Sequence, residues 1–255
     1  MGTAIALIVL LVLVIGGGIY FVRTQAARRQ RQLDDAKADA RRWVERLGGQ
    51  VLNLTGTDIA SQQAMADASE RYNAAGSELE QAQTAEQARL ARQTALEGLY
   101  YVRAARTAMG MDPGPELPED RERERAGKVT EHRSVEVEGH TYEASPEPGQ
   151  HTPHYYPGGR VAGRPVPQGW YSEPWWKPAL VAGAWGLGSM LLFSAMFSGM
   201  AGIPDAAAWE AGYDAGQQDA MESGDMGDGG AADMGGDPGG MDMGGDMGGM
   251  DLGGF

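Results

Sequence analysis

Residues 84–109 read TAEQARLARQTALEGLYYVRAARTAM and contain no proline. Apolar residues recur in this stretch at spacings of three and four, which is the period of an amphipathic helix. Thr84 stands three residues before Gln87, the spacing of a capping box at a helix start. The stretch therefore predicts a helix with one buried face, formed by Ala88, Ala91, Ala95, Leu99, Val102, Ala105 and Met109.

Two more helical segments precede this one, because residues 24–109 as a whole are rich in Ala, Gln, Glu and Arg, which favour helix. The first is predicted over about 24–47, with a stop at Gly48–Gly49. The second is predicted to start near Thr57–Asp58, whose side chains can cap exposed N–H groups. Their apolar faces are Leu33, Ala36, Ala40, Trp43, Val44 and Leu47, and then Met65, Ala68, Tyr72, Ala75, Leu79 and Ala82.

Three amphipathic helices with short connections predict an antiparallel bundle over residues 24–110. Its core is thin, because alanine supplies many of the buried positions and each alanine buries little area. We therefore expect marginal stability unless a partner protein or an oligomer helps. The connection at residues 51–56, VLNLTG, is apolar for a linker. Its leucines either cover the end of the bundle core or form a docking loop.

Two uncharged stretches predict membrane spans. Residues 3–22 read TAIALIVLLVLVIGGGIYFV and residues 179–203 read ALVAGAWGLGSMLLFSAMFSGMAGI. Each is long enough to cross a hydrocarbon layer of roughly 30 Å as a helix. Basic residues follow the first stretch and do not precede it, which favours an uncleaved anchor over a signal peptide. The aromatic cluster before the second stretch is typical of the membrane interface: Trp170, Tyr171, Trp175 and Trp176.

The predicted topology follows from the positions of the basic residues. All 21 Lys and Arg residues lie between Arg23 and Lys177, so residues 23–177 are predicted to be cytoplasmic and both ends extracytoplasmic. The chain would then be a multi-pass protein of the cell membrane, with the lipid bilayer as a partner. Small residues in the second span, Ala184 with Gly188 and Ala195 with Gly199, fit helix–helix oligomerisation or chance in an Ala/Gly-rich segment.

Residues 111–178 are predicted to be a Pro/Gly-rich linker. Proline ends the helical domain at the sequence MDPGPELP, because it cannot continue a helix. Residues 133–144 alternate with a period of two around Glu138–Gly139, which predicts a short β-hairpin. A lone hairpin is barely stable, so this one must pack on something else. Residues 146–178 are expected to run on as an irregular segment.

The tail, residues 204–255, is acidic and becomes a repeat of Gly, Asp and Met, which predicts disorder. Thioether sulfurs suit Cu(I), and the spacing of four methionines allows two sulfurs on one ion: Met241, Met243, Met247 and Met250. The alternative is that these methionines are apolar contacts in a disordered tail. His151 and His154 could touch a metal, but no strong third ligand accompanies them.

No known catalytic motif is recognisable, so we expect no enzyme activity and no cofactor. The net charge of -14 argues against nucleic acid as a partner, and the absence of cysteine excludes thiol chemistry. The prediction for function is a non-catalytic scaffold at the membrane, whose helical domain binds an unidentified protein. The alternative is extracytoplasmic Cu(I) binding by the tail.

Four stretches carry a resemblance: RRWVERLGGQVLNL at 41–54, ALEGLYYVRAARTAMGMDP at 95–113, YYPGG at 155–159 and GWYSEPWWKP at 169–178. With these, the chain resembles an uncharacterised family of actinobacterial membrane proteins that have a helical domain of unknown function and a Gly/Asp-rich C-terminal tail. The resemblance implies a helical domain between spans and no catalytic residue. Tails in that family carry Phe or Tyr where this chain carries Met, which favours an apolar contact over a copper ligand.

Overall fold

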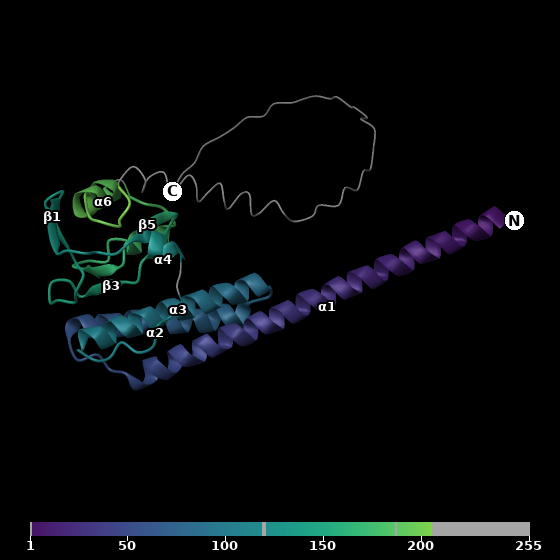
Figure 1. The fold of residues 1–255 in the computed structure, drawn as a ribbon, viewed down its shortest axis with the longest axis horizontal. Helices are drawn as coiled ribbons and strands as arrows, with labels where there is room; N and C mark the ends of the chain where they lie inside the picture. The colour runs from purple at the N-terminus through teal and green to yellow at the C-terminus, as the bar shows by residue number, and fades with distance from the viewer. Residues whose placement is uncertain (1, 119–120, 187, 206–255) are drawn as a thin grey trace, which may run out of the picture.

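The computed structural model describes residues 2–118, 121–186 and 188–205, which form a helical bundle and a smaller unit of strands and short helices (Figure 1). The bundle consists of α1 (Gly2–Asn53), α2 (Ile59–Gln81) and α3 (Ala85–Ala108). We call residues 121–205 the sheet unit. It contains α4 (Arg121–Ala126), β1 (Arg133–Val137), β2 (His140–Ser145), β3 (His154–Tyr156), β4 (Gly159–Val161), β5 (Arg164–Val166), β6 (Gly169–Tyr171), α5 (Lys177–Ala182) and α6 (Ser189–Phe197).

Helices α2 and α3 begin at capping boxes. The Asp58 carboxylate accepts a hydrogen bond from the backbone N–H of Ser61 at 2.9 Å, at the start of α2. Thr84 Oγ1 accepts one from the N–H of Gln87 at 3.2 Å, at the start of α3. Each bond satisfies an N–H that has no partner within the helix. The starts of both helices are therefore set by local side-chain chemistry.

The bundle core consists mainly of small side chains. Helix α3 buries the alanines of its predicted face, together with Leu99 and Val102, and Tyr101 joins them. The apolar residues at 51–54, expected in a connection, lie in the last turn of α1 and directly after it. Val51 and Leu54 pack against the core, whereas Leu52 is 78% exposed.

Helix α1 is one continuous helix, so the predicted stop at Gly48–Gly49 is wrong. Gly48 is buried against α2, and a Cβ atom there would lie 2.7 Å from the ring of Tyr72. The glycine is a close helix–helix contact and does not end the helix. The N-terminal part of α1 projects away from the other two helices (Figure 1), and Tyr20, Phe21 and Val22 are exposed.

The predicted membrane topology is contradicted. Within the described part of the chain, no helix is both long enough and apolar enough to cross a bilayer. This finding overturns the prediction of a multi-pass membrane protein with spans at 3–22 and 179–203. The predicted orientation, with residues 23–177 in the cytoplasm, depends on those spans and is therefore not supported either.

The apolar stretch 179–203 instead folds into the sheet unit. Helix α5 ends at Gly183, which has φ 69° and closes the helix with a hydrogen bond from its N–H to Ala179 O. Helix α6 starts six residues later and buries Leu192, Phe193, Met196 and Phe197. Of the small residues proposed for oligomerisation, Ala195 lies in α6, whereas Ala184, Gly188 and Gly199 lie outside the helices. They therefore do not share a helix face.

Residues 121–178, predicted to be mostly linker, hold all the described strands. A four-stranded antiparallel sheet has the order β1-β2-β6-β3, and β4 pairs with β5 in a separate hairpin. The first two strands form the hairpin expected over 133–144, with its turn at Glu138–Gly139. The hairpin packs on β6, because Ala144 of β2 pairs with Tyr171 of β6. This far partner was not evident from the local sequence pattern.

The sheet lies between two cores. Tyr155 and Trp170 are cross-strand neighbours on β3 and β6, and both pack with the bundle core. The next residues, Tyr156 and Tyr171, pack into the second core with α5 and α6. Successive residues of a strand point to opposite faces, so one pair of three-residue strands joins the bundle to the sheet unit.

Candidate functional site

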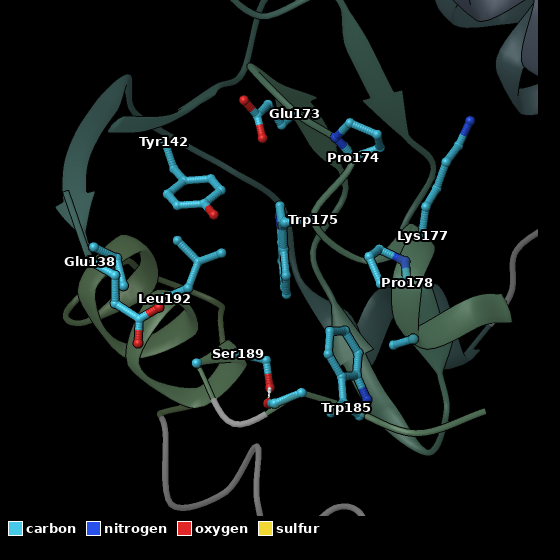
Figure 2. A pocket seen from close by; sticks show the side chains of 14 residues that line it. Glu138, Tyr142, Glu173, Pro174, Trp175, Lys177, Pro178, Trp185, Ser189 and Leu192 are labelled. Carbon is cyan, nitrogen blue, oxygen red and sulfur yellow. Dashed lines mark hydrogen bonds between the residues drawn. The ribbon is translucent and has the colours of Figure 1, made fainter. Parts of the chain in front are cut away.

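A pocket of about 510 Å³ opens in the sheet unit between the β1–β2 turn, the segment after β6 and the start of α6 (Figure 2). We call it the aromatic pocket, because three aromatic side chains from different segments line it. Its wall residues are Val137, Glu138, Tyr142, Glu173, Pro174, Trp175, Lys177, Pro178, Ala179, Trp185, Gly186, Gly188, Ser189 and Leu192. Figure 2 shows Trp175 standing between Tyr142 and Trp185.

Local backbone chemistry brings the two tryptophans together. Pro178 lies in the first turn of α5, where a missing N–H costs nothing. Gly183 then reverses the chain in the left-handed conformation. The indole N–H of Trp185 donates to Val161 O at 2.9 Å, which fixes the connection between α5 and α6 to β4. As a result the rings of Trp175 and Trp185 lie with centroids 5.5 Å apart.

Trp175 is held in place by other rings. Its centroid is 6.1 Å from that of Trp176 and 6.1 Å from that of Phe197. Its Nε1 is buried and makes no hydrogen bond with the described residues. A buried donor without a partner costs free energy, about 1–3 kcal/mol, and such positions in folded proteins call for a functional or structural reason. Ring contacts, and not a hydrogen bond, therefore position Trp175 in the pocket wall.

Acidic side chains outnumber basic ones in the wall of the pocket. Glu138 and Glu173 supply two carboxylates, and Glu173 Oε1 lies 2.7 Å from His140 Nε2. Lys177 is the one basic side chain among the wall residues, and its ammonium group pairs with Asp67 of α2 at 3.0 Å. Figure 2 shows the end of Lys177 directed away from the pocket centre. The opening of the pocket is therefore acidic.

The pocket contains no arrangement for nucleophilic catalysis. The hydroxyl of Ser189 donates its proton to the backbone carbonyl of Gly186 at 2.7 Å, not to a basic group. An activated serine would need a base within hydrogen-bonding reach. The chemistry that the wall can perform is binding, through ring faces, proline surfaces and carboxylates.

The contact between the pocket and the bundle is polar and partly buried. Asp67 is 7% exposed and is paired with Lys177, which ties the segment after β6 to α2. Nearby, Arg71 and Glu97 pair at 3.2 Å between α2 and α3. Burial raises the pKa of Glu97, while the guanidinium of Arg71 opposes that rise. The Asp67–Lys177 pair thus joins the sheet unit to the bundle, and the Arg71–Glu97 pair joins α2 to α3 within the bundle.

None of the described residues that line the aromatic pocket is a site residue predicted from the sequence. Met241, Met243, Met247 and Met250 lie outside the described residues. His151 is exposed, whereas His154 begins β3 and is half-buried, and burial lowers its pKa. Within the described residues, no group of three or more His, Asp or Glu side chains could hold a metal ion.

The sequence pattern predicts a different role for the tryptophans of the pocket. It predicts a membrane-interface anchor at Trp175, which precedes the uncharged stretch 179–203, and a place within a span for Trp185, which lies inside that stretch. The signal that could have redirected this interpretation is the pair Pro174 and Pro178 together with Gly183 and Gly186. Proline and glycine at such spacing favour turns over a continuous helix.

Comparisons with protein-family models, curated proteins and solved structures gave no match. The resemblance to the actinobacterial family stays a prediction. The features of the described residues that bear on function are those of the aromatic pocket.

Proposed function

We propose that this chain is a non-catalytic protein-interaction module, in which the aromatic pocket holds an extended segment of a partner protein that carries apolar and basic residues. The observation that carries the proposal is the preformed pocket of about 510 Å³ with its three aromatic side chains. Trp, Tyr and Arg dominate binding energy at protein interfaces, and peptide-binding grooves are often lined by aromatic rings.

The size and charge of the pocket select the kind of partner. A volume of about 510 Å³ admits a few side chains and not a folded domain. The carboxylates of Glu138 and Glu173 favour a basic segment, because opposite charge steers and orients association. The remainder of this chain after residue 177 has no Lys or Arg, so its own tail is a poor occupant.

The bundle serves as the support in this proposal. It contacts the sheet unit through the ion pair between Asp67 and Lys177 and through Tyr101, whose ring is 6.0 Å from that of Tyr155. A site gains affinity when its wall is rigid before the ligand arrives. The sequence pattern favours the bundle surface as the interaction face, whereas the aromatic pocket lies in the sheet unit.

The test is a selection of peptides from a random display library on the full chain. Selected peptides should bind in solution and should lose about tenfold or more in affinity with Tyr142→Ala or Trp185→Ala. Both side chains are partly exposed but pack against the second core, so the near-UV circular dichroism of each variant should match that of the unmodified chain before its affinity is compared. The matched control is Leu191→Ala, an apolar side chain of α6 that is 62% exposed and does not line the pocket.

Two results would refute the proposal. The first is a set of selected peptides that bind the pocket variants as well as the unmodified chain. The second is loss of binding on substitution of an exposed residue of α3 such as Leu90, with Tyr142→Ala and Trp185→Ala silent. That outcome would place the interaction on the bundle.

A further inference from the structure

Glu138 occupies a strained backbone position at the edge of the aromatic pocket. Its φ is 55°, in the two-residue turn between β1 and β2, and Gly139 follows with φ 79°. Such turns favour Asn or Gly, and a longer side chain in the left-handed region costs about 1 kcal/mol or more. Strain that is kept beside a pocket points to a use for the side chain.

The other groups at the pocket leave this carboxylate without a competing cation. Glu173 pairs with His140, and the ammonium group of Lys177 pairs with Asp67 on the bundle. Glu138 is exposed on the turn, and its carboxylate lies 3.7 Å from the position that a Cβ atom of Gly188 would take. The strained turn thus places a negative charge beside the ring-lined wall.

The rings provide the second attraction for a cation. The face of an aromatic ring carries partial negative charge, and a cation within about 6 Å of its centroid is stabilised, most strongly by Trp. Tyr142, Trp175 and Trp185 all contribute to the pocket wall, and Trp175 lies between the other two in Figure 2. An acidic opening over aromatic walls is the arrangement that recognises ammonium groups.

We propose that the aromatic pocket binds an alkylated ammonium group, carried on a side chain of the partner segment; this rests on the proposed function. A bare ammonium ion is compact and strongly hydrated, so its transfer into an apolar pocket is costly. Methyl groups spread the charge and lower that cost, while they fill the pocket and contact the rings. The apolar wall, including Leu192 and Pro178, therefore favours the alkylated form.

The first experiment compares choline with 3,3-dimethyl-1-butanol (dimethylbutanol below), the neutral analogue that has a tert-butyl group in place of the trimethylammonium group. Saturation-transfer NMR on the full chain measures the affinity of each probe through its methyl protons. Choline should bind about tenfold more tightly than its neutral analogue, and its affinity should fall as salt is added. Equal affinity for the two probes would overturn the proposal.

Two substitutions separate the cation site from the fold. Glu138→Asn should relieve the turn strain and raise the melting temperature, yet weaken choline binding by about fivefold. Tyr142→Leu should keep an apolar wall and reduce the preference for choline over dimethylbutanol, because one of the three rings is lost. The matched control is Glu136→Gln, which removes an exposed charge from β1 away from the pocket. Unchanged choline affinity in Glu138→Asn would overturn the proposal.

A peptide arm separates this inference from the proposed function. One selected peptide is prepared with lysine, with trimethyllysine and with a neutral tert-butyl analogue at the same position. Tighter binding of the trimethyllysine form supports both statements. Pocket-dependent binding that is equal for all three forms overturns the cation inference and leaves the proposed function standing. Choline binding without any peptide binding overturns the proposed function and the partner segment as the source of the ammonium group.

Discussion

The bundle and the sheet unit reach a closed core by opposite means. In the bundle, Ala64, Ala68 and Ala95 are completely buried, and long helices approach closely across them. In the sheet unit, the strands are mostly three residues long and the largest buried side chains are Trp176, Tyr171, Phe193 and Phe197. Long elements satisfy their own backbone and need little area per residue, whereas short ones depend on large rings for burial.

The difference has a consequence for stability. Rings of the second core contact one another across segments: the centroid of the Trp176 ring lies 4.9 Å from that of Tyr156 on β3 and 5.0 Å from that of Tyr171 on β6. Removal of one ring therefore affects several segments at once. The bundle spreads its burial over many small contacts, and single truncations there act more locally.

Replacement of Trp176 by alanine is expected to have the largest effect. Loss of this buried ring should destabilise the sheet unit by about 3–5 kcal/mol, because it removes apolar burial and leaves a cavity. Near-UV circular dichroism should lose much of its signal at temperatures where the far-UV helix signal persists.

The matched bundle variant is Leu99→Ala, a side chain that is 3% exposed. This substitution should lower the free energy of unfolding of the bundle by about 2–5 kcal/mol. The melting temperature of the far-UV helix signal should fall accordingly. If both variants melt in one identical transition by both signals, the two units do not differ in the way described.

Alkaline pH should act on both units where they meet, because burial raises the pKa of tyrosines on each side, including Tyr101 of α3. Burial raises the pKa of Tyr155 from 10.0 to about 12, and burial also raises the pKa values of Tyr156 and Tyr171. As pH rises, the unfolded chain therefore loses these phenolic protons at a lower pH than the folded protein does. The stability is fully present below pH 10 and is lost as pH rises through the folded-state value of about 12 for Tyr155. Tyr155 alone accounts for about 3 kcal/mol of that loss.

Urea unfolding followed by near-UV circular dichroism over this pH range checks the expectation. Tyr155→Phe should flatten the pH dependence, whereas Tyr20→Phe, at a position 72% exposed, should leave it unchanged. A midpoint that is constant from neutral pH to beyond the pKa of Tyr155 would contradict the burial argument.

Two glycine substitutions in the bundle should give smaller effects of opposite sign. A Cβ atom at Gly98 would lie 2.4 Å from Leu47 Cδ2 and 3.1 Å from Arg71 Cβ. Gly98→Ala should thus destabilise by about 1–3 kcal/mol through overpacking. Gly49 has nothing within 4 Å of its Cβ position, so Gly49→Ala should stabilise the helix by up to about 1 kcal/mol. Thermal unfolding of the two variants followed by far-UV circular dichroism tests this expectation. Stabilisation by both substitutions would show that the bundle is not closely packed at Gly98.

The local pattern located the helices well where their signals are local. The caps at Asp58 and Thr84 and the buried face of α3 follow from spacing alone, because a helix repeats every few residues. The β1–β2 turn was likewise located by Glu138–Gly139. The same reasoning failed at Gly48, since whether a glycine ends a helix or allows close packing depends on Tyr72 of another helix.

The candidate site was not foreseen. An uncharged stretch beside clustered tryptophans predicts a membrane span with interface anchors. A hydropathy sum depends only on residue types and contains no information on which side chains they contact in the fold. In the fold, Phe193 and Phe197 face Trp175 and Tyr171, so apolar side chains assigned to lipid pack against rings. The wall of the aromatic pocket combines Tyr142, Trp175 and Trp185, which neighbour one another only after the chain has folded.

The sequence by itself determined the starts of α2 and α3, the small-residue faces of the bundle and the first hairpin, because hydrogen bonds and side-chain periodicity act between residues near in the chain. Only the tertiary structure decided the partners of β2 and β6, the two faces of the β3–β6 pair and the fate of residues 179–203. Those outcomes depend on which distant apolar surfaces meet, and burial free energy is non-directional: it rewards contact area without specifying the partner. The aromatic pocket belongs to this second class.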